Sequence, residues 1–65
     1  MVLTLEADYA VRIVDDLAQS KRIVDARTLS EHTRVPLRFA LKILRKLVAS
    51  GLIVSYKGAH GGYIL

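Results

Sequence analysis

The segment between Pro36 and Gly51 constrains the fold more than any other part of this 65-residue chain. On a helix, which turns about 100° per residue, its apolar and basic side chains separate into two continuous arcs. The apolar arc holds Leu37, Phe39, Ala40, Leu41, Ile43, Leu44, Leu47 and Val48, and the basic arc holds Arg38, Lys42, Arg45 and Lys46. Pro36 suits the start of a helix, and Gly51 offers a left-handed C-terminal cap. We therefore expect a helix over residues 37–50 with its apolar arc on a core and its cationic row in solvent.

A second amphipathic pattern occupies residues 4–19. Its apolar side chains follow the i, i+3, i+4, i+7 spacing of one helix face, at Ala10, Ile13, Val14 and Leu17. Thr4 is a suitable N-cap, and Glu6 and Asp8 fall in the first turn, where the helix dipole favours acidic side chains. Ile23-Val24, further along, is too short to form more than an edge strand.

Residues 25–33 predict a shorter helix between the other two. Asp25 and Thr28 are alternative N-caps, and the choice between them moves the start of the helix by three residues. The helix should end near Thr33, because Pro36 disfavours helical geometry at the residue before it. A tight turn should therefore join this helix to the basic one.

After Gly51 the period of the pattern changes from that of a helix to that of a strand. Residues 52–57 place Leu52, Val54 and Tyr56 on one side and Ile53, Ser55 and Lys57 on the other. Residues 63–65 can return as a second strand, and the glycines between supply the positive φ angles of a hairpin loop. A phosphate-binding loop is disfavoured, because it needs a helix after the glycines and only three residues follow them.

The charge is divided unevenly along the chain. Residues 1–31 hold six acidic and four basic side chains, a net charge of −2, whereas residues 32–65 hold six basic and no acidic ones, a net charge of +6. A half-chain with positive charge alone is typical of a surface that faces a polyanion. The alternative is a solvated face that only keeps the protein soluble. The sequence places no acidic side chain in the cationic row of residues 37–50, so we expect no acid to neutralise it.

Several classes of protein are disfavoured. The chain has no cysteine, which excludes a disulfide, a zinc–thiolate site or a cysteine nucleophile. His32 and His60 fall on different predicted elements, and no serine has the surroundings of an activated nucleophile, so we expect neither an enzyme nor a metal site. No apolar run approaches the roughly 18 residues of a membrane span, and no signal peptide is evident. We expect a cytoplasmic protein with no membrane partner.

The order helix, short helix, turn, basic helix and glycine-tipped hairpin is that of a winged helix-turn-helix. The predicted fold is thus mainly α with a small β-hairpin, three helices plus a wing, over one domain of residues 1–65. We expect it to bind double-stranded DNA and to regulate transcription. The recognition helix 37–50 would enter the major groove, and the wing 57–62 would lie at the minor groove.

The basic residues divide into two groups by position. Arg38, in the first turn of the recognition helix, is best placed to contact a guanine. The base-reading candidates are Arg38, Lys42 and Arg45, and the expected phosphate or wing contacts are Arg34, Lys46, Lys57, His60 and Gly61. Two interpretations of His60 stay open, because it can donate to a phosphate or simply be solvated.

Three segments, "LTLEADYAVR", "VPLRFALKILRKLVASGLIVS" and "KGAHGGYIL", resemble the Rrf-type bacterial transcription regulators. The family pattern has Tyr-Ala in its first helix, Ile-Leu-x-x-Leu-x-x-x-Gly-Leu at the end of the helix-turn-helix, and Arg-Gly-x-x-Gly-Gly-Tyr-x-Leu in the wing. The matching positions are Tyr9-Ala10, Ile43-Leu44, Leu47, Gly51-Leu52, Lys57-Gly58, Gly61-Gly62-Tyr63 and Leu65. The resemblance implies a DNA-binding repressor or activator that acts as a dimer on an imperfect palindrome.

The chain departs from that family pattern at several points. Lys57 replaces the usual arginine, Leu41 stands where some members carry a polar base-reading residue, and Arg34 occupies a turn position often held by glycine. A left-handed backbone at Arg34 would cost about 1 kcal/mol. The resemblance also implies a long dimerisation helix and, in the sensors, three cysteines that bind an iron–sulfur cluster. Both are absent from these 65 residues, so we expect no cofactor and a weakened homodimer.

A winged-helix module that binds another protein is the alternative function. In that case the apolar residues Leu41, Val48 and Ile53 would form the edge that meets the partner.

Overall fold

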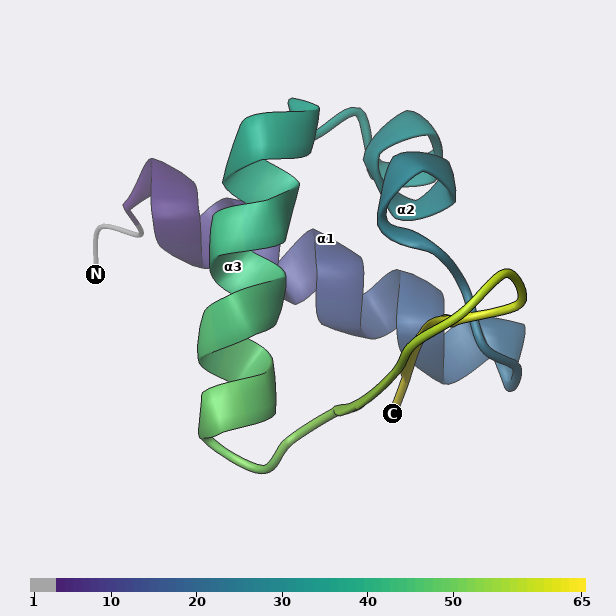
Figure 1. Cartoon of the computed structure of the whole chain (residues 1–65). Coiled ribbons are helices and arrows are strands. Elements are labelled where there is room, and N and C mark those ends of the chain that lie inside the picture. The colour runs from purple at the N-terminus through teal and green to yellow at the C-terminus, as the bar shows by residue number, and fades with distance from the viewer. Residues whose placement is uncertain (1–3) are drawn as a thin grey trace.

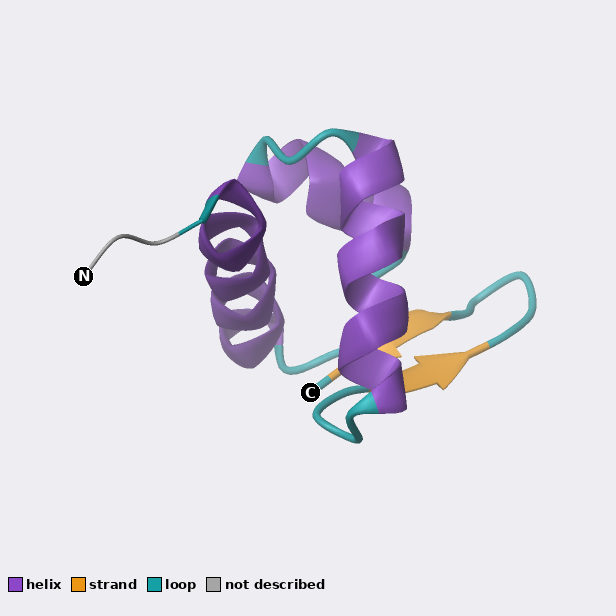
Figure 2. Cartoon of the chain, turned by 90° about the vertical axis from the view of Figure 1, so that its left-hand side faces the viewer, coloured by secondary structure: helices purple, strands orange, loops and turns teal. Residues whose placement is uncertain are grey.

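The chain folds into three helices followed by a two-stranded hairpin (Figure 1). The computed structural model describes residues 4–65. The helices are α1 (Leu5–Ser20), α2 (Ala26–Thr33) and α3 (Leu37–Ala49), and the strands are β1 (Val54–Tyr56) and β2 (Gly62–Ile64). Figure 2 shows the hairpin turn reaching out beyond the helices. This is the arrangement that the sequence predicts, and the basic helix ends one residue earlier than expected.

The helix ends form as the local sequence predicts. The Thr4 side chain accepts a hydrogen bond from the Ala7 amide at 3.1 Å and caps α1. The Asp25 carboxylate accepts from the Thr28 amide at 3.3 Å, so Asp25 rather than Thr28 is the N-cap of α2. Gly51, with a φ of 82°, supplies the left-handed residue that follows α3.

Asp25 makes the stability of the domain depend on pH. The Thr28 hydroxyl and amide both donate to the Asp25 carboxylate and hold its pKa below the ordinary value. A lowered pKa in the folded state adds stability above the unfolded pKa of about 3.9, and this stability is lost as pH falls through the folded pKa. Asp25→Asn keeps a good cap but cannot titrate. We expect the difference in melting temperature between wild type and Asp25→Asn to change as pH falls from neutral to below about 4. A difference that stays constant over this range would contradict the assignment.

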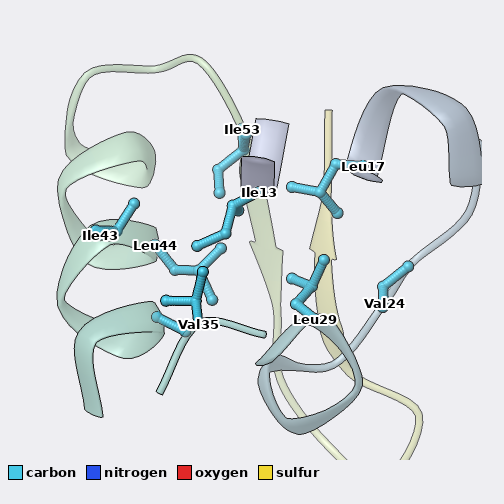
Figure 3. Packing of buried hydrophobic residues seen from close by; sticks show 9 residues of the cluster. Ile13, Leu17, Val24, Leu29, Val35, Ile43, Leu44 and Ile53 are labelled. Atoms are coloured by element: carbon cyan, nitrogen blue, oxygen red, sulfur yellow. The ribbon is translucent and has the colours of Figure 1, made fainter. Parts of the chain in front are cut away.

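One hydrophobic cluster joins every part of the fold (Figure 3). Its buried members are Ile13, Leu17, Val24, Leu29, Val35, Ala40, Ile43, Leu44 and Ile53. Two residues of the expected apolar arc of α3 are exposed, Phe39 to 38% and Leu41 to 39%. The arc is wider than the strip that α1 and α2 cover, so its two edges stay in solvent.

The burial of Ile53 corrects the apolar edge expected for the alternative function. Its side chain is only 2% exposed and belongs to the core, so it cannot form an apolar edge for a protein partner. Its predicted strand neighbours on the other side, Leu52, Val54 and Tyr56, are the exposed ones. Ser55 and Lys57, which share the predicted side of Ile53, are exposed too, so the pattern predicted the strand but not a buried side of it.

The hairpin pairs through Tyr63 with Val24, in the connection between α1 and α2. β1 and β2 pair antiparallel, with Ser55 opposite Tyr63. On its other side Tyr63 exchanges two backbone hydrogen bonds with Val24, at 2.9 and 2.8 Å. Val24 thus acts as the short edge strand that the sequence allowed, and it fixes the direction of the hairpin against the connection between α1 and α2.

No helix among residues 4–65 is both long and apolar enough to cross a membrane.

Candidate nucleic-acid interface

Helix α3 carries the candidate surface because its two sides differ in chemistry. Ala40, Ile43 and Leu44 are buried on the inner side. Arg38, Lys42 and Arg45, at i, i+4 and i+7, share an exposed side because these spacings align residues on one helix face. The three predicted base-reading residues therefore lie together. The Arg38 guanidinium lies 5.2 Å from the centre of the neighbouring Phe39 ring.

Glu6 in α1 overturns the prediction that no acid accompanies this row. Its carboxylate lies 2.6 Å from Lys46 Nζ and 4.0 Å from Lys42 Nζ. The hydrogen bond and charge of Lys46, and then the charge of Lys42, hold the pKa of Glu6 below its ordinary value. In the described part of the chain, by contrast, no carboxylate is paired with Arg38 or Arg45. The row thus has two kinds of residue. Lys42 and Lys46 pair with Glu6 and are called the shared lysines below, and Arg38 and Arg45, which pair with no carboxylate in the described residues, are called the unshared arginines.

Removing the Glu6 charge should strengthen binding to any polyanion. In Glu6→Gln both lysines lose their carboxylate partner, and the negative charge beside the basic face disappears. We expect every DNA duplex to bind about twofold to fivefold more tightly at low salt, with the gain shrinking as salt is added. Fluorescence anisotropy with labelled duplexes measures this change.

Asp8→Asn is the matched control for Glu6→Gln. It removes the same charge two residues further along α1, but Asp8 pairs with Arg12 at 2.9 Å and not with α3. The control should therefore tighten binding much less. Equal effects of the two variants would show that the total charge, and not the contact with the lysines, sets the affinity.

Arg34 forms the turn of the helix-turn-helix in the expected strained geometry. Its φ of 57° and ψ of 34° are left-handed, and its side chain is exposed next to the start of α3. A left-handed backbone costs a residue with a side chain about 1–2 kcal/mol. The side chain of Arg34 places a positive charge beside the first turn of α3.

The wing residues lie where the sequence predicts. Lys57 and His60 are exposed, and the turn closes through a hydrogen bond of 3.0 Å from the Gly61 amide to the Gly58 carbonyl. A Cβ on Gly61 would meet the Tyr56 carbonyl oxygen too closely, so Gly61 allows the two arms of the loop to approach. Gly61 therefore shapes the wing, and its predicted contact with DNA stays a prediction.

The hairpin lies beside the exposed face of α3. A hollow of about 180 Å³ separates them, lined by Leu41, Arg45, Val48, Ser55 and Tyr63. The basic row and the hairpin therefore border one continuous surface, which is the arrangement that a winged helix needs to span two grooves of a duplex.

His32 lies apart from this surface. Its Nδ1 atom is 3.3 Å from the Asp16 carboxylate, so it links α2 to α1. Among residues 4–65, no three histidine, aspartate or glutamate side chains are grouped so that they could hold a metal ion.

One contact of this surface was missed by the sequence analysis. The Glu6–Lys46 pair joins residues 40 positions apart, and the only local signal of Glu6 was its favourable place in the first turn of α1. Leu41, by contrast, was placed both in the apolar arc and, for the alternative function, on an apolar edge, and its exposure agrees with the edge.

The comparisons with known proteins agree with the fold and with the candidate surface. Residues 3–65 match the family model described as "Rrf2: Iron-dependent Transcriptional regulator". The protein rrf2 of Nitratidesulfovibrio vulgaris (strain Hildenborough) is 33% identical over 67 residues, which cover 100% of this chain and 45% of that protein. A family of transcriptional regulators agrees with the expectation that the chain is not an enzyme.

Two solved structures share the fold over the full length of this chain. The structure of T. potens IscR superposes with a TM-score of 0.89 at 28% identity and is covered to 49%. The structure of CymR, the global cysteine regulator of B. subtilis, superposes with a TM-score of 0.92 at 21% identity and is covered to 52%. The chain thus spans about half the length of the relatives it matches.

Proposed function

We propose, since the chain belongs to the Rrf2 family of transcriptional regulators, that it binds double-stranded DNA through α3 and the hairpin. In this proposal residues 1–65 act as a winged helix-turn-helix DNA-binding domain. The recognition helix enters the major groove, and the wing, residues 57–62, lies at the adjacent minor groove.

The observation that carries the proposal is the pair of unshared arginines on the exposed face of α3. Arg38 and Arg45 lie about two helical turns apart on one side of α3, away from its buried side, and Arg45 also borders the hollow beside the hairpin. A guanidinium offers donors in a planar fork that matches guanine O6 and N7, and it also pairs well with phosphate. Arg38, in the first turn, is the better candidate for a base, because recognition helices contact bases with their N-terminal residues.

The shared lysines suit a different role. Lys46 and Lys42 are both paired with the Glu6 carboxylate. To contact DNA, each lysine must either break this ion pair or keep it alongside the new contact, so a DNA oxygen competes with a carboxylate already in place. That exchange suits phosphate contacts, which are numerous and need no match to one base, better than the fixed geometry of a base contact. Lys42 therefore keeps its predicted base-reading role only where the duplex displaces Glu6.

Arg34 and the wing complete the proposed contact surface. Arg34 lies at the turn before α3, where a phosphate on the near strand would meet it. Lys57 and His60 extend from the exposed hairpin turn, where a narrow minor groove would concentrate negative potential.

The family description names iron, and the described residues do not fit an iron site. The chain has no cysteine, and residues 4–65 contain no group of three possible ligands. We therefore propose that these residues bind DNA without a cofactor of their own. Repression, action in the cytoplasm and binding as a homodimer to two half-sites belong to the same proposal.

Selection of bound sequences from a pool of random duplexes tests the proposed function. A winged helix that reads bases should enrich a short preferred sequence, and a variant lacking Arg38 should lose the preference at one or two positions of it. Recovery of no preferred sequence, together with no binding of any duplex, would contradict the proposal.

A further inference from the structure

We propose that Leu41 reads a thymine, by contact with its 5-methyl group in the major groove. The inference rests on the proposed function and adds to it, since it names an apolar determinant of specificity on a surface otherwise described by its charge.

The position of Leu41 on α3 is the first argument. It lies three residues after Arg38 and four residues before Arg45, so it borders both arginines on the helix surface. Its side chain is 39% exposed, whereas its neighbour Ala40 is 0% exposed and Leu44, one turn later, is also 0% exposed. Leu41 therefore extends from the same surface that presents the guanidinium groups.

The surroundings of Leu41 are the second argument. It lines the hollow of about 180 Å³ between α3 and the hairpin, together with Val48 and Tyr63, and Arg45 and Ser55 supply its polar edge. The exposed side chain of Leu41 therefore has both apolar and polar neighbours, the mixture that the edge of a base pair also presents in the major groove. The hollow opens beside Arg45, one of the proposed base-reading arginines.

Charge decides which partner fits this hollow. An apolar protein partner seated on Leu41 would cover Arg38 and Arg45 and leave their charges without water or a counter-charge, which is costly. A DNA duplex supplies phosphates and guanine acceptors to both arginines at once. In the major groove the thymine methyl is the one apolar group that a base pair presents, so it is the group that Leu41 would contact.

Replacement of thymine by uracil in the preferred duplex isolates this contact. Uracil keeps every hydrogen bond of thymine and lacks only the methyl group. For the wild-type protein we expect one thymine in each half-site whose change to uracil weakens binding about fourfold, as expected for one buried methyl group. Leu41→Ala should bind the thymine duplex more weakly and should bind the thymine and uracil duplexes equally.

Val48→Ala is the matched control. Val48 lines the same hollow but lies about two turns further along α3 than Leu41, beyond Arg45, the last of the base-reading candidates. It should keep the fourfold preference for thymine, and circular dichroism melts of both variants report whether the fold is intact. The uracil scan of the wild-type protein needs no variant, so the test does not depend on the folding of Leu41→Ala.

The results separate this inference from the proposed function. Tight, sequence-dependent binding with no loss at any thymine-to-uracil change would overturn the role of Leu41 and leave DNA binding intact. A preference for thymine that persists in Leu41→Ala would overturn it as well. Absence of duplex binding under all conditions would instead overturn the proposed function itself.

Discussion

Gly62→Ala should detach the hairpin from the helices and lower the free energy of unfolding by about 2–4 kcal/mol. Gly62 has a φ of 156°, and a Cβ there would lie 2.5 Å from the Val24 carbonyl oxygen and 2.7 Å from its carbon. These are backbone atoms of the residue that anchors β2, so they cannot move aside without breaking the two Val24–Tyr63 hydrogen bonds. A thermal melt followed by circular dichroism measures the loss, which should reach about 10–25 °C for a domain of this size.

Gly58→Ala is the control for this result. Gly58 also has a positive φ, 107°, but a Cβ there would meet nothing within 4 Å. It should therefore show only the cost of the left-handed backbone, about 1–2 kcal/mol, and should leave the hairpin attached. Equal losses in the two variants would mean that strain in the loop, and not the contact with Val24, accounts for the effect.

Arg38→Ala should weaken binding to the preferred duplex by about 1–3 kcal/mol and should relax the preference at the base it contacts. The reason is the loss of the two hydrogen bonds that a guanidinium can donate to one guanine. Lys46→Ala should weaken binding to preferred and random duplexes by similar, smaller factors, because Lys46 already shares Glu6 at 2.6 Å. Competition experiments with preferred and random duplexes measure both quantities.

Arg38→Lys separates the charge of the side chain from its shape. Lysine keeps the positive charge but loses the planar fork, so binding to random DNA should be nearly unchanged while the preference for one sequence falls. If Arg38→Ala and Lys46→Ala weaken both kinds of duplex in the same ratio, Arg38 does not read a base.

Local signals in the sequence were enough to predict the order of elements. The arc of Ala40, Ile43 and Leu44 predicted the buried face of α3, and the cap at Thr4 predicted the start of α1. Such features depend on residues within one or two turns of each other, so the chain itself displays them. The left-handed backbone at Arg34 was expected from the glycine that the family pattern often has there, and its φ of 57° confirms it.

Contacts between residues far apart in the sequence could not be predicted from local signals. Nothing near Glu6 in the sequence indicates that it will meet Lys46, because that meeting depends on the angle at which α1 crosses α3. The burial of Ile53, in place of Leu52 or Val54, depends likewise on how the hairpin is attached at Val24. The predicted cationic row was therefore correct in its position on α3, and the prediction that no acid accompanies it was wrong.

The salt dependence of duplex binding tests the central proposal most directly. The affinity for one duplex should be measured by fluorescence anisotropy between about 50 and 200 mM salt. Four to six phosphate contacts by the basic face would give a log–log slope between about −3.6 and −5.4. An affinity that stays flat over this range would show that the exposed arginines and lysines of α3 do not meet the phosphates of DNA.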